Sequence, residues 1–174
     1  MAAYVAGDQA AFRELFLRYS GVLLSLLGRH VAVRGEAADL VQQTFLQLHR
    51  ARHDFDPTRR LRPWLVTIAM NLRREQMRRL ARRPDLLPQA EAFPDIPAEE
   101  RSATRVEVGQ LVRRALEELP SEQREAIELH WVAGLPFQEV GQVMGISSAA
   151  ARGRAHRGYV RLREILAVLD DDSA

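Results

Sequence analysis

The 174-residue chain contains no cysteine, no lysine and no long uninterrupted apolar run. Without cysteine the protein can form no disulfide and no thiolate metal site, which fits a location in the reducing cytoplasm. No segment offers the roughly 18 consecutive apolar residues that indicate a membrane-spanning helix, so we expect no membrane insertion. The N-terminus lacks a basic stretch followed by an apolar run, so we expect no secretory signal.

Residue patterns that carry catalysis are also missing. The sequence has no glycine-rich phosphate loop and no serine or carboxylate cluster suited to nucleophilic or acid–base chemistry. His49 and His53 are spaced like the histidine pair of zinc proteases, but arginine stands where the catalytic glutamate would follow the first histidine. We therefore expect no enzyme activity, no metal site and no cofactor.

Because lysine is absent, every permanently positive side chain is an arginine, and the arginines are concentrated. Residues 59–83 hold nine arginines and one acid, residues 147–163 hold five arginines and no acid, and residues 84–100 hold five acids and no base. Arginine binds phosphate and guanine edges through paired hydrogen bonds. Two cationic segments separated by an acidic one indicate two surfaces that face phosphate, although a solvated helix face would give either run alone the same composition.

The apolar pattern predicts an all-α fold, because no segment alternates as a strand does. Apolar side chains recur at helical spacing in residues 12–27, 40–48, 63–83, 108–119, 121–132, 137–144 and 148–163. We expect a turn at 34–36, and helix N-caps at Asp8, at Ser121 and at Ser147 or Ser148. Trp131 is expected to face the core.

Residues 84–100 divide the chain. Four prolines in this acidic segment, Pro84, Pro88, Pro94 and Pro97, cannot continue a helix and favour extended backbone. We expect two small helical domains, residues 1–83 and 105–174, joined by a flexible linker over 84–104.

The second domain is expected to contain a helix-turn-helix. A short helix over 137–144 is followed by Gly145, which can supply a left-handed turn, and Gly141 is small where the two helices must approach closely. In the next helix we expect the alanines to face the core and the arginines to point outward; these are Ala150, Ala151 and Ala155, and Arg152, Arg154 and Arg157. Such a cationic helix fits the DNA major groove, but a helical hairpin with no DNA role would have the same core.

Several segments in order resemble one family. They are D-L-V-Q-Q-T-F at 39–45, F-D-P at 55–57, W-L-V-T-I-A-M-N at 64–71, L-P-S-E-Q-R-E-A at 119–126, G-L-P-F at 134–137 and R-A-H-R at 154–157. Together they closely resemble the extracytoplasmic-function (ECF) sigma factors of the sigma-70 family, the smallest promoter-specificity subunits of bacterial RNA polymerase. The resemblance implies an alternative sigma factor that binds core polymerase, recognises −35 and −10 promoter elements and aids −10 melting. Its two domains would be region 2 and region 4, the latter a winged-helix-like helix-turn-helix.

The resemblance also implies partners and sites. Core RNA polymerase would be bound through its β′ clamp and β flap, with Asp39, Gln42, Gln43 and Leu46 at the clamp. An anti-sigma factor is a further expected partner. The acidic linker would enter the polymerase cleft and RNA exit path, unless it is only a passive connection.

For the −10 element, the resemblance points to the loop over 53–62 and the helix that follows it. The residues expected to bind melted −10 DNA are Asp56, Arg59, Arg60, Arg62, Trp64, Asn71, Arg74 and Arg78. Asn71 offers an amide donor and acceptor near the loop. The helical spacing of Trp64 favours a core position, from which it can also pack under the loop.

The residues expected at the −35 duplex are Ser147, Ser148, Ala149, Arg152, Arg154 and Arg157. Ala150 and Gly153 stand where the family commonly has a β-branched residue and a serine, so −35 recognition here leans on DNA shape. The alternative is a free-standing regulator that binds operator DNA without polymerase, and it leaves the first domain without a role. Run-off transcription with core polymerase distinguishes the two.

Overall fold

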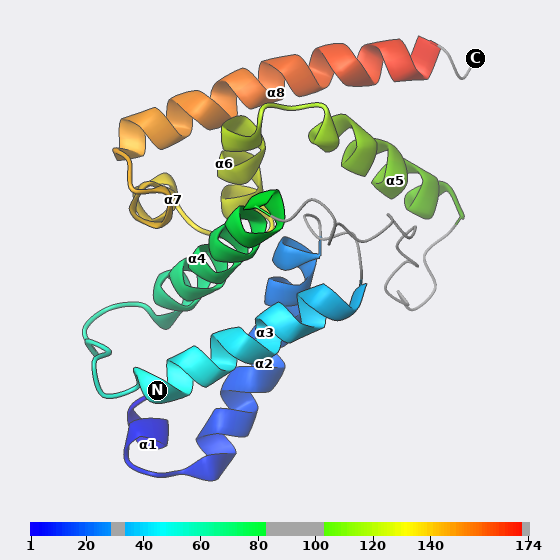
Figure 1. Ribbon diagram of the computed structural model, residues 1–174. Helices are drawn as coiled ribbons and strands as arrows, with labels where there is room; N and C mark the ends of the chain where they lie inside the picture. Colours follow the sequence, from blue (N-terminus) through cyan, green and yellow to red (C-terminus); the bar gives the residue numbers. More distant parts are fainter. Residues whose placement is uncertain (29–33, 83–102, 172–174) are drawn as a thin grey trace. The chain divides into compact units, whose positions relative to one another are not determined.

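The computed structural model describes residues 1–28, 34–82 and 103–171, which form eight α-helices and their connections (Figure 1). The predicted all-α class is confirmed, because these three ranges contain no strand. For the same reason, the described part of the helix-turn-helix has no β-wing, and its likeness to winged-helix proteins is limited to its helices.

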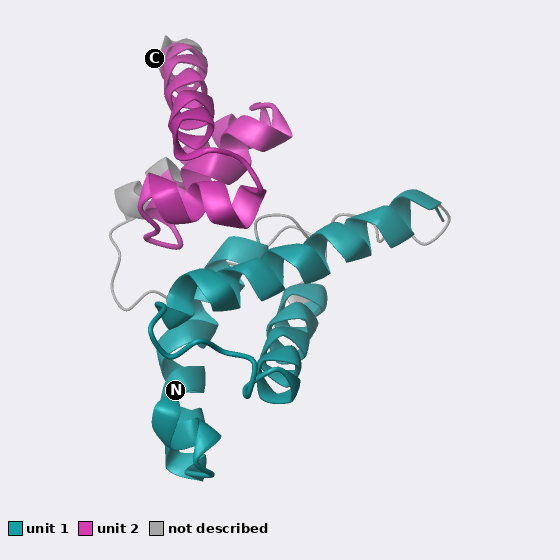
Figure 2. Ribbon diagram, turned by 90° about the vertical axis from the view of Figure 1, so that its left-hand side faces the viewer, with its two compact units in different colours: residues 1–93 teal, residues 94–174 magenta. Residues whose placement is uncertain are grey.

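The chain divides into two compact units, residues 1–93 and 94–174 (Figure 2). Most of the predicted linker, residues 84–102, lies outside the described residues, as does the expected end of the preceding helix at Arg83 and Pro84. Ala103 and Thr104 were predicted to lie in the linker but are the first residues of helix α5.

Unit 1 contains α1 (Ala2–Val5), α2 (Gln9–Leu27), α3 (Arg34–Arg50) and α4 (Leu61–Arg82). Helices α2, α3 and α4 pack against one another, and α1 packs on α2. Their shared core includes Leu23, Leu26, Leu27, Leu40, Leu48, Leu65 and Met70, all essentially inaccessible to solvent.

The helix starts in unit 1 test two local predictions. Asp8 is the N-cap of α2, as predicted, and its Oδ1 accepts from the backbone N–H groups of Ala10 and Ala11 at 2.8 and 3.3 Å. The predicted turn at 34–36 is wrong, because these residues form the first turn of α3. Glu36 suits that position, since a negative charge near a helix N-terminus is stabilising.

Unit 2 contains α5 (Ala103–Glu117), α6 (Ser121–Trp131), α7 (Phe137–Met144) and α8 (Ser148–Asp171). The long helix α8 packs against the other three. Leu116, Leu119, Ala126, Ile127 and Ala155 form one buried cluster of this unit.

Two predictions about α6 are wrong. Ser121 is not a cap, because Pro120 occupies the N-cap position and Ser121 is the first helical residue. Trp131 does not face the core: it is 70% exposed, and its indole N–H donates to the hydroxyl of Tyr159 on α8. The Tyr159 hydroxyl gives the polar indole nitrogen a hydrogen-bond partner at the surface, which explains the exposed position of this large ring.

Candidate nucleic-acid interface

The helix-turn-helix closes through two glycines. Gly145 has φ 68°, the left-handed conformation that glycine adopts without strain. Ile146 N–H then donates to the carbonyl of Gly141 at 2.9 Å. A Cβ on Gly141 would lie 2.7 Å from the backbone oxygen of Ile146 and 3.1 Å from the nitrogen of Ser148. Both glycine predictions are confirmed, since α7 touches the start of α8 at the backbone itself.

The first residues of α8 are held by a serine cap. Ser147 Oγ accepts from the backbone N–H of Ala150 at 3.1 Å, which identifies Ser147 rather than Ser148 as the N-cap. Ala149 is exposed and Ser148 is half-buried. The positive dipole end of α8 therefore stands beside a small exposed residue, an arrangement that admits a phosphate.

Small residues give α8 its buried face. Ala151 and Ala155 are fully buried, as predicted, whereas Ala150 is exposed, contrary to prediction. Consecutive residues in an α-helix are rotated by about 100°, so Ala150 cannot share the buried direction of Ala151. At Gly158, a Cβ would lie 2.7 Å from Ile127 Cδ1, so α8 and α6 also approach closely.

The three arginines predicted to point outward differ in their surroundings. Arg152 and Arg157 are exposed. Arg154 is partly buried: its side chain is only 24% exposed, and its guanidinium pairs with Glu122 of α6 at 3.1 Å. Arg154 lies about 60° from Ala151 on the helical circuit, which places it at the edge of the buried face.

An aromatic stack under Arg152 was missed in the sequence. The Arg152 guanidinium lies over the ring of Phe137 at 5.7 Å from its centroid. Phe137 in turn stacks on His130, with 4.2 Å between centroids and 15° between planes. His130 is fixed by a hydrogen bond between Nδ1 and the carbonyl of Leu135 at 2.8 Å. The G-L-P-F segment was a signal that Phe137 matters, but no local pattern connects it to Arg152.

In unit 1, the loop between α3 and α4 is held by its own side chains. Asp56 Oδ1 accepts from the N–H of Thr58 at 2.9 Å and from its hydroxyl at 2.7 Å. Its other oxygen lies 3.3 Å from Nε of Arg59. Two residues predicted to bind DNA therefore stabilise the loop in the free protein, and both remain exposed.

Aromatic contacts connect this loop to α4. Trp64 is half-buried, so the core position that its helical spacing favoured is not observed. Its ring lies 5.0 Å from that of Phe55 in the loop, and it therefore packs against the loop as expected. Phe55, part of the F-D-P segment, was not among the predicted site residues. Arg62 lies over the ring of Tyr19 on α2 at 5.9 Å, and Arg60 is exposed.

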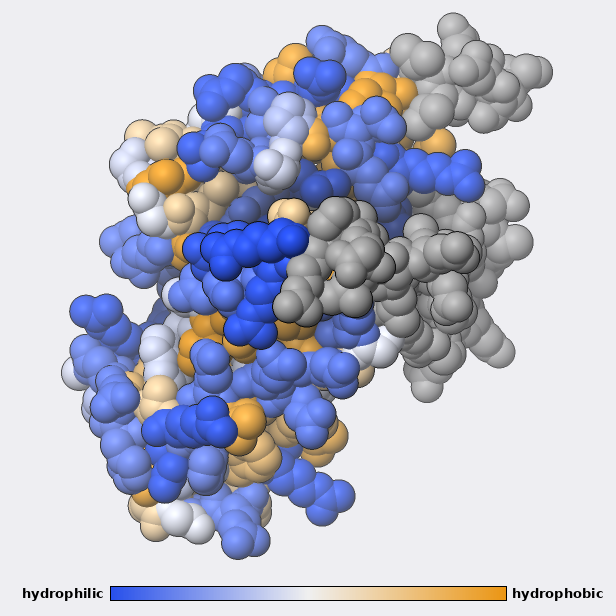
Figure 3. All heavy atoms as spheres, viewed as in Figure 1, coloured by the Kyte–Doolittle hydropathy of each residue, from blue (hydrophilic) through white to orange (hydrophobic). Residues whose placement is uncertain are grey.

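The remaining predicted −10 residues lie further along α4. Asn71 is exposed and its Oδ1 accepts from Arg74 at 3.1 Å, while Arg78 pairs with Glu75 at 3.0 Å. Asn71 follows Leu61 by ten residues, so at 1.5 Å per residue it stands about 15 Å along the helix from the end of the loop. Asn71 is thus on the same helix as Trp64, which contacts the loop, but it does not lie beside the loop. Figure 3 shows mainly hydrophilic side chains where α4 reaches the visible surface.

The residues predicted to dock polymerase share one exposed side of α3. Asp39, Gln42, Gln43 and Leu46 are all exposed. Leu46 is 47% exposed although it is apolar. The opposite side of the helix is buried and contains Leu40, Val41, Thr44, Phe45 and Leu48.

Protonation of Asp56 should loosen the loop. The two hydrogen bonds from Thr58, and more weakly the charge of Arg59, lower the pKa of Asp56 below its ordinary value of 3.8. The stabilisation is therefore complete above that ordinary value and is lost as the pH falls through the lower folded pKa. An NMR titration should show the Asp56 carboxyl and the Thr58 amide changing together below pH 3.8.

A matched pair of variants isolates the cause. Thr58→Val removes the hydroxyl donor and should raise the Asp56 pKa toward its ordinary value. Thr67→Val, which removes a hydroxyl bonded to Pro63 O on α4, should leave the Asp56 titration unchanged. Titration of wild-type Asp56 at or above 3.8 would contradict the assigned hydrogen bonds.

Neither a metal centre nor a membrane span is found in the parts of the chain that the structure describes. No group of three or more histidine, aspartate or glutamate side chains in these residues could hold a metal ion. No described helix is both long enough and apolar enough to cross a bilayer.

Comparison with known proteins agrees with the two units. Residues 15–83 match the family Sigma-70 region 2, and residues 109–162 match the family Sigma-70, region 4. The chain is 39% identical over 170 residues to the RNA polymerase sigma factor CarQ of Myxococcus xanthus, covering 94% of each chain. It is 32% identical to the ECF RNA polymerase sigma factor SigE of Mycolicibacterium smegmatis, covering 97% of this chain and 67% of SigE.

Solved structures give the same result. CnrH, in complex with the cytosolic domain of CnrY, superposes with a TM-score of 0.72 at 30% identity, covering 98% of this chain and 95% of CnrH. The sigma factor RpoE from Bartonella quintana, in complex with the anti-sigma factor NepR, superposes with a TM-score of 0.76 at 25% identity, covering 91% and 98%. The chain therefore belongs to the ECF sigma factors of the sigma-70 family, non-enzymatic subunits that direct RNA polymerase to promoters.

Proposed function

We propose that the two units divide promoter recognition between paired and unpaired DNA. Region 4, residues 103–174, binds the −35 duplex, and region 2, residues 1–83, binds the melted −10 strand and the polymerase clamp, with the acidic segment 84–102 between them. The observation that carries this proposal is the exposed pair Arg152 and Arg157 on a helix whose N-terminus is held by a closed helix-turn-helix. A free-standing regulator is no longer an alternative, because unit 1 matches region 2.

The −35 surface is built from α8. Ala149, Arg152 and Arg157 are exposed and can approach the floor or the walls of the major groove, while Ser147 and Ser148 place the helix N-terminus at a phosphate. Arg154 takes part from a partly buried position, held by Glu122. The small residues Ala149, Ala150 and Gly153 limit the side chains available for base contacts, which supports recognition through DNA shape as well as through contacts.

The −10 surface combines the loop and α4. The ordered loop offers Arg59 and Arg60 at its surface, and the contact between Phe55 and Trp64 fixes it to the helix. Asn71 keeps its amide N–H₂ available for a base edge, since only its oxygen is engaged by Arg74. Arginines can hold the backbone phosphates while an unstacked base is bound.

Protein partners are proposed for the exposed side of α3 and for the chain as a whole. An apolar Leu46 among the polar Asp39, Gln42 and Gln43 is suited to a protein interface with the β′ clamp, and the β flap is proposed as a contact of region 4. RpoE was solved with the anti-sigma factor NepR, and CnrH was solved with the cytosolic domain of CnrY. We therefore propose an anti-sigma partner and a cytoplasmic location for this protein.

Asn71→Ala tests the −10 assignment. Loss of the hydrogen bond from the Asn71 amide to a base edge should destabilise the open complex by roughly 0.5–1.5 kcal/mol, whereas binding to core polymerase should be unchanged. Permanganate oxidation of unpaired thymines measures the bubble, and gel filtration with core polymerase measures binding.

Asn71→Asp is the matched second variant. It keeps the oxygen that accepts from Arg74 and removes the amide donor, so it should fail to melt DNA as Asn71→Ala does. A bubble equal to that of the wild type in both variants would refute the role of Asn71. A defect in Asn71→Ala alone would show that the lost contact with Arg74 is the cause.

A further inference from the structure

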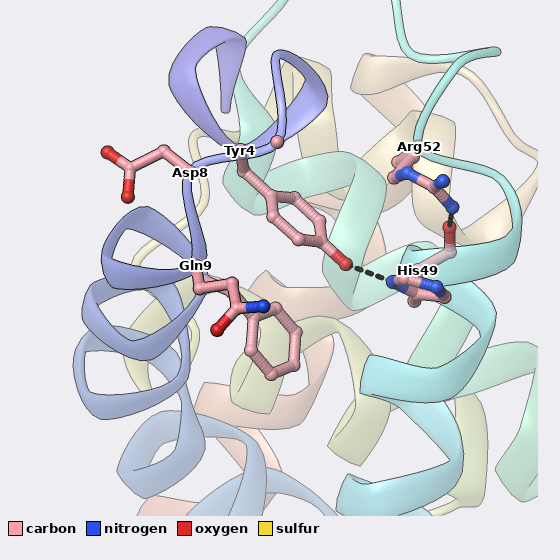
Figure 4. Close-up of a pocket in the computed structure, with 7 residues that line it drawn as sticks. Tyr4, Asp8, Gln9, His49 and Arg52 are labelled. Carbon is pink, nitrogen blue, oxygen red and sulfur yellow. Dashed lines mark hydrogen bonds between the residues drawn. The ribbon is translucent and has the colours of Figure 1, made fainter.

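A pocket that the proposed function does not use lies at the N-terminal end of unit 1 (Figure 4). Its volume is about 520 Å³, and its lining comes from α1, the start of α2 and the end of α3. The lining residues are Tyr4, Gly7, Asp8, Gln9, Phe12, His49 and Arg52.

The floor of the pocket is aromatic and fixed. Tyr4 is only 8% exposed, and its ring lies 5.1 Å from that of Phe12. Burial raises the pKa of the Tyr4 hydroxyl, so it stays protonated, and the hydroxyl shares a hydrogen bond with Nδ1 of His49 at 2.5 Å. This contact joins α1 to the end of α3, as Figure 4 shows.

The rim of the pocket carries hydrogen-bond donors. Arg52 is half-buried, and its Nη1 donates to the carbonyl of His49 at 2.6 Å, which holds the guanidinium beside the opening. Gln9 is exposed at the opposite side. The one acid of the lining, Asp8, is engaged as the cap of α2 and its carboxylate points away from Tyr4 and His49 (Figure 4). An anionic group can therefore approach Arg52 without facing a free carboxylate in the cavity.

We propose that this pocket binds one unstacked nucleobase of the single-stranded promoter strand, with Arg52 at the adjoining phosphate. The base would place its apolar face toward Tyr4 and Phe12 and its polar edge toward Gln9 and His49. This combination of an aromatic surface and a nearby cation is the one that single-stranded nucleic acid binding requires.

The position of the pocket on the chain supports the same ligand. Arg52 belongs to the connection between α3 and α4, four residues before Asp56 in the ordered loop. A strand that follows this loop would reach the pocket at a nucleotide different from the one bound on α4. The proposal rests on the assignment of single-stranded DNA to unit 1, and it adds a second base site there.

The test uses holoenzyme, assembled from the full chain and core polymerase, and fluorescence anisotropy with a labelled non-template oligonucleotide across the −10 element. Arg52→Ala removes the cation. Gln9→Trp, at an exposed position, fills the opening without disturbing the core. Each should weaken oligonucleotide binding about fivefold or more. Fivefold corresponds to about 1 kcal/mol, the smallest effect expected for one stacked base. Arg50→Ala is the matched control, because Arg50 is exposed on the same helix end, carries the same charge and does not line the pocket.

Abasic oligonucleotides locate the base. With the wild type, an abasic site at the bound position should weaken binding by the same factor as Gln9→Trp, because each removes the base from the pocket. In Gln9→Trp holoenzyme, that same abasic site should have no further effect, because the filled opening already excludes the base. In Arg52→Ala holoenzyme the abasic site should still weaken binding, because Arg52 contacts the phosphate and not the base.

Four outcomes would overturn the proposal. The first is an equal loss from Arg50→Ala and Arg52→Ala, and the second is an abasic effect that is the same in wild type and Gln9→Trp at every position. The third is no change with Gln9→Trp. The fourth is weaker binding to core polymerase in the variants, which would make the pocket a protein-docking site. In each case an intact Asn71-dependent bubble leaves the proposed −10 function standing. Failure of wild-type holoenzyme to bind the oligonucleotide would remove that function as well.

Discussion

Gly141→Ala should open the helix-turn-helix and abolish binding to the −35 element. The added Cβ would meet three backbone atoms, the oxygen of Ile146 at 2.7 Å, the nitrogen of Ser148 at 3.1 Å and the carbonyl carbon of Ser147 at 3.2 Å. Backbone atoms cannot rotate away as a side chain does, so α7 and α8 must separate. Overpacking of this kind destabilises a folded unit by roughly 1–3 kcal/mol.

The measurement is hydrogen exchange of the α7 and α8 amides, together with binding to duplex −35 DNA. Gly109→Ala is the control: a Cβ there has nothing within 4 Å, and alanine favours a helix over glycine by about 1 kcal/mol. The control should therefore be neutral or stabilising and should bind DNA as the wild type does. Wild-type exchange rates in Gly141→Ala would show that the turn can relax around the methyl group.

Removing both Arg152 and Arg157 should weaken −35 binding about tenfold or more and flatten its salt dependence. Each phosphate contact contributes about 0.9 to the slope of log K against log salt concentration, so two lost contacts should reduce it by up to about 1.8. Both side chains are exposed in the free protein, so their loss should leave the helix intact.

The measurement is duplex binding at several salt concentrations. The control is Arg13→Ala with Arg18→Ala, which removes the same net charge from exposed positions on α2. The control should keep the wild-type slope. An unchanged slope in the Arg152 and Arg157 variant would rule out phosphate contacts by these residues, and a change confined to affinity would assign them to base edges instead.

Local features of the fold could be predicted from the sequence because each depends on neighbouring residues. Asp8, Gly145 and the bounds of α7 follow from capping, turn geometry and helical spacing. The predictions for Ser121 and Ala150 were each wrong by one residue. Pro120, the residue before Ser121, is the N-cap of α6, and Ala151, the residue after Ala150, is the buried one.

Contacts between distant segments could not be predicted. Tyr4 and His49 lie 45 residues apart, and Trp131 and Tyr159 lie 28 apart. No periodicity within one helix indicates which ring of another helix it meets. The family resemblance located the −10 and −35 surfaces, but it did not indicate that Asp56 and Arg154 are already engaged by Thr58 and Glu122.

The stack of Phe137 on His130 has a thermodynamic consequence for Arg152. An arginine side chain carries roughly 2 kcal/mol of rotamer entropy, which is lost when DNA immobilises it. A ring beneath the guanidinium restricts it before DNA arrives, so less freedom remains to be lost. Phe137 and His130, which need not touch the promoter, can thereby influence the affinity for promoter DNA. Promoter preference can therefore change during evolution while the DNA-contacting residues stay the same.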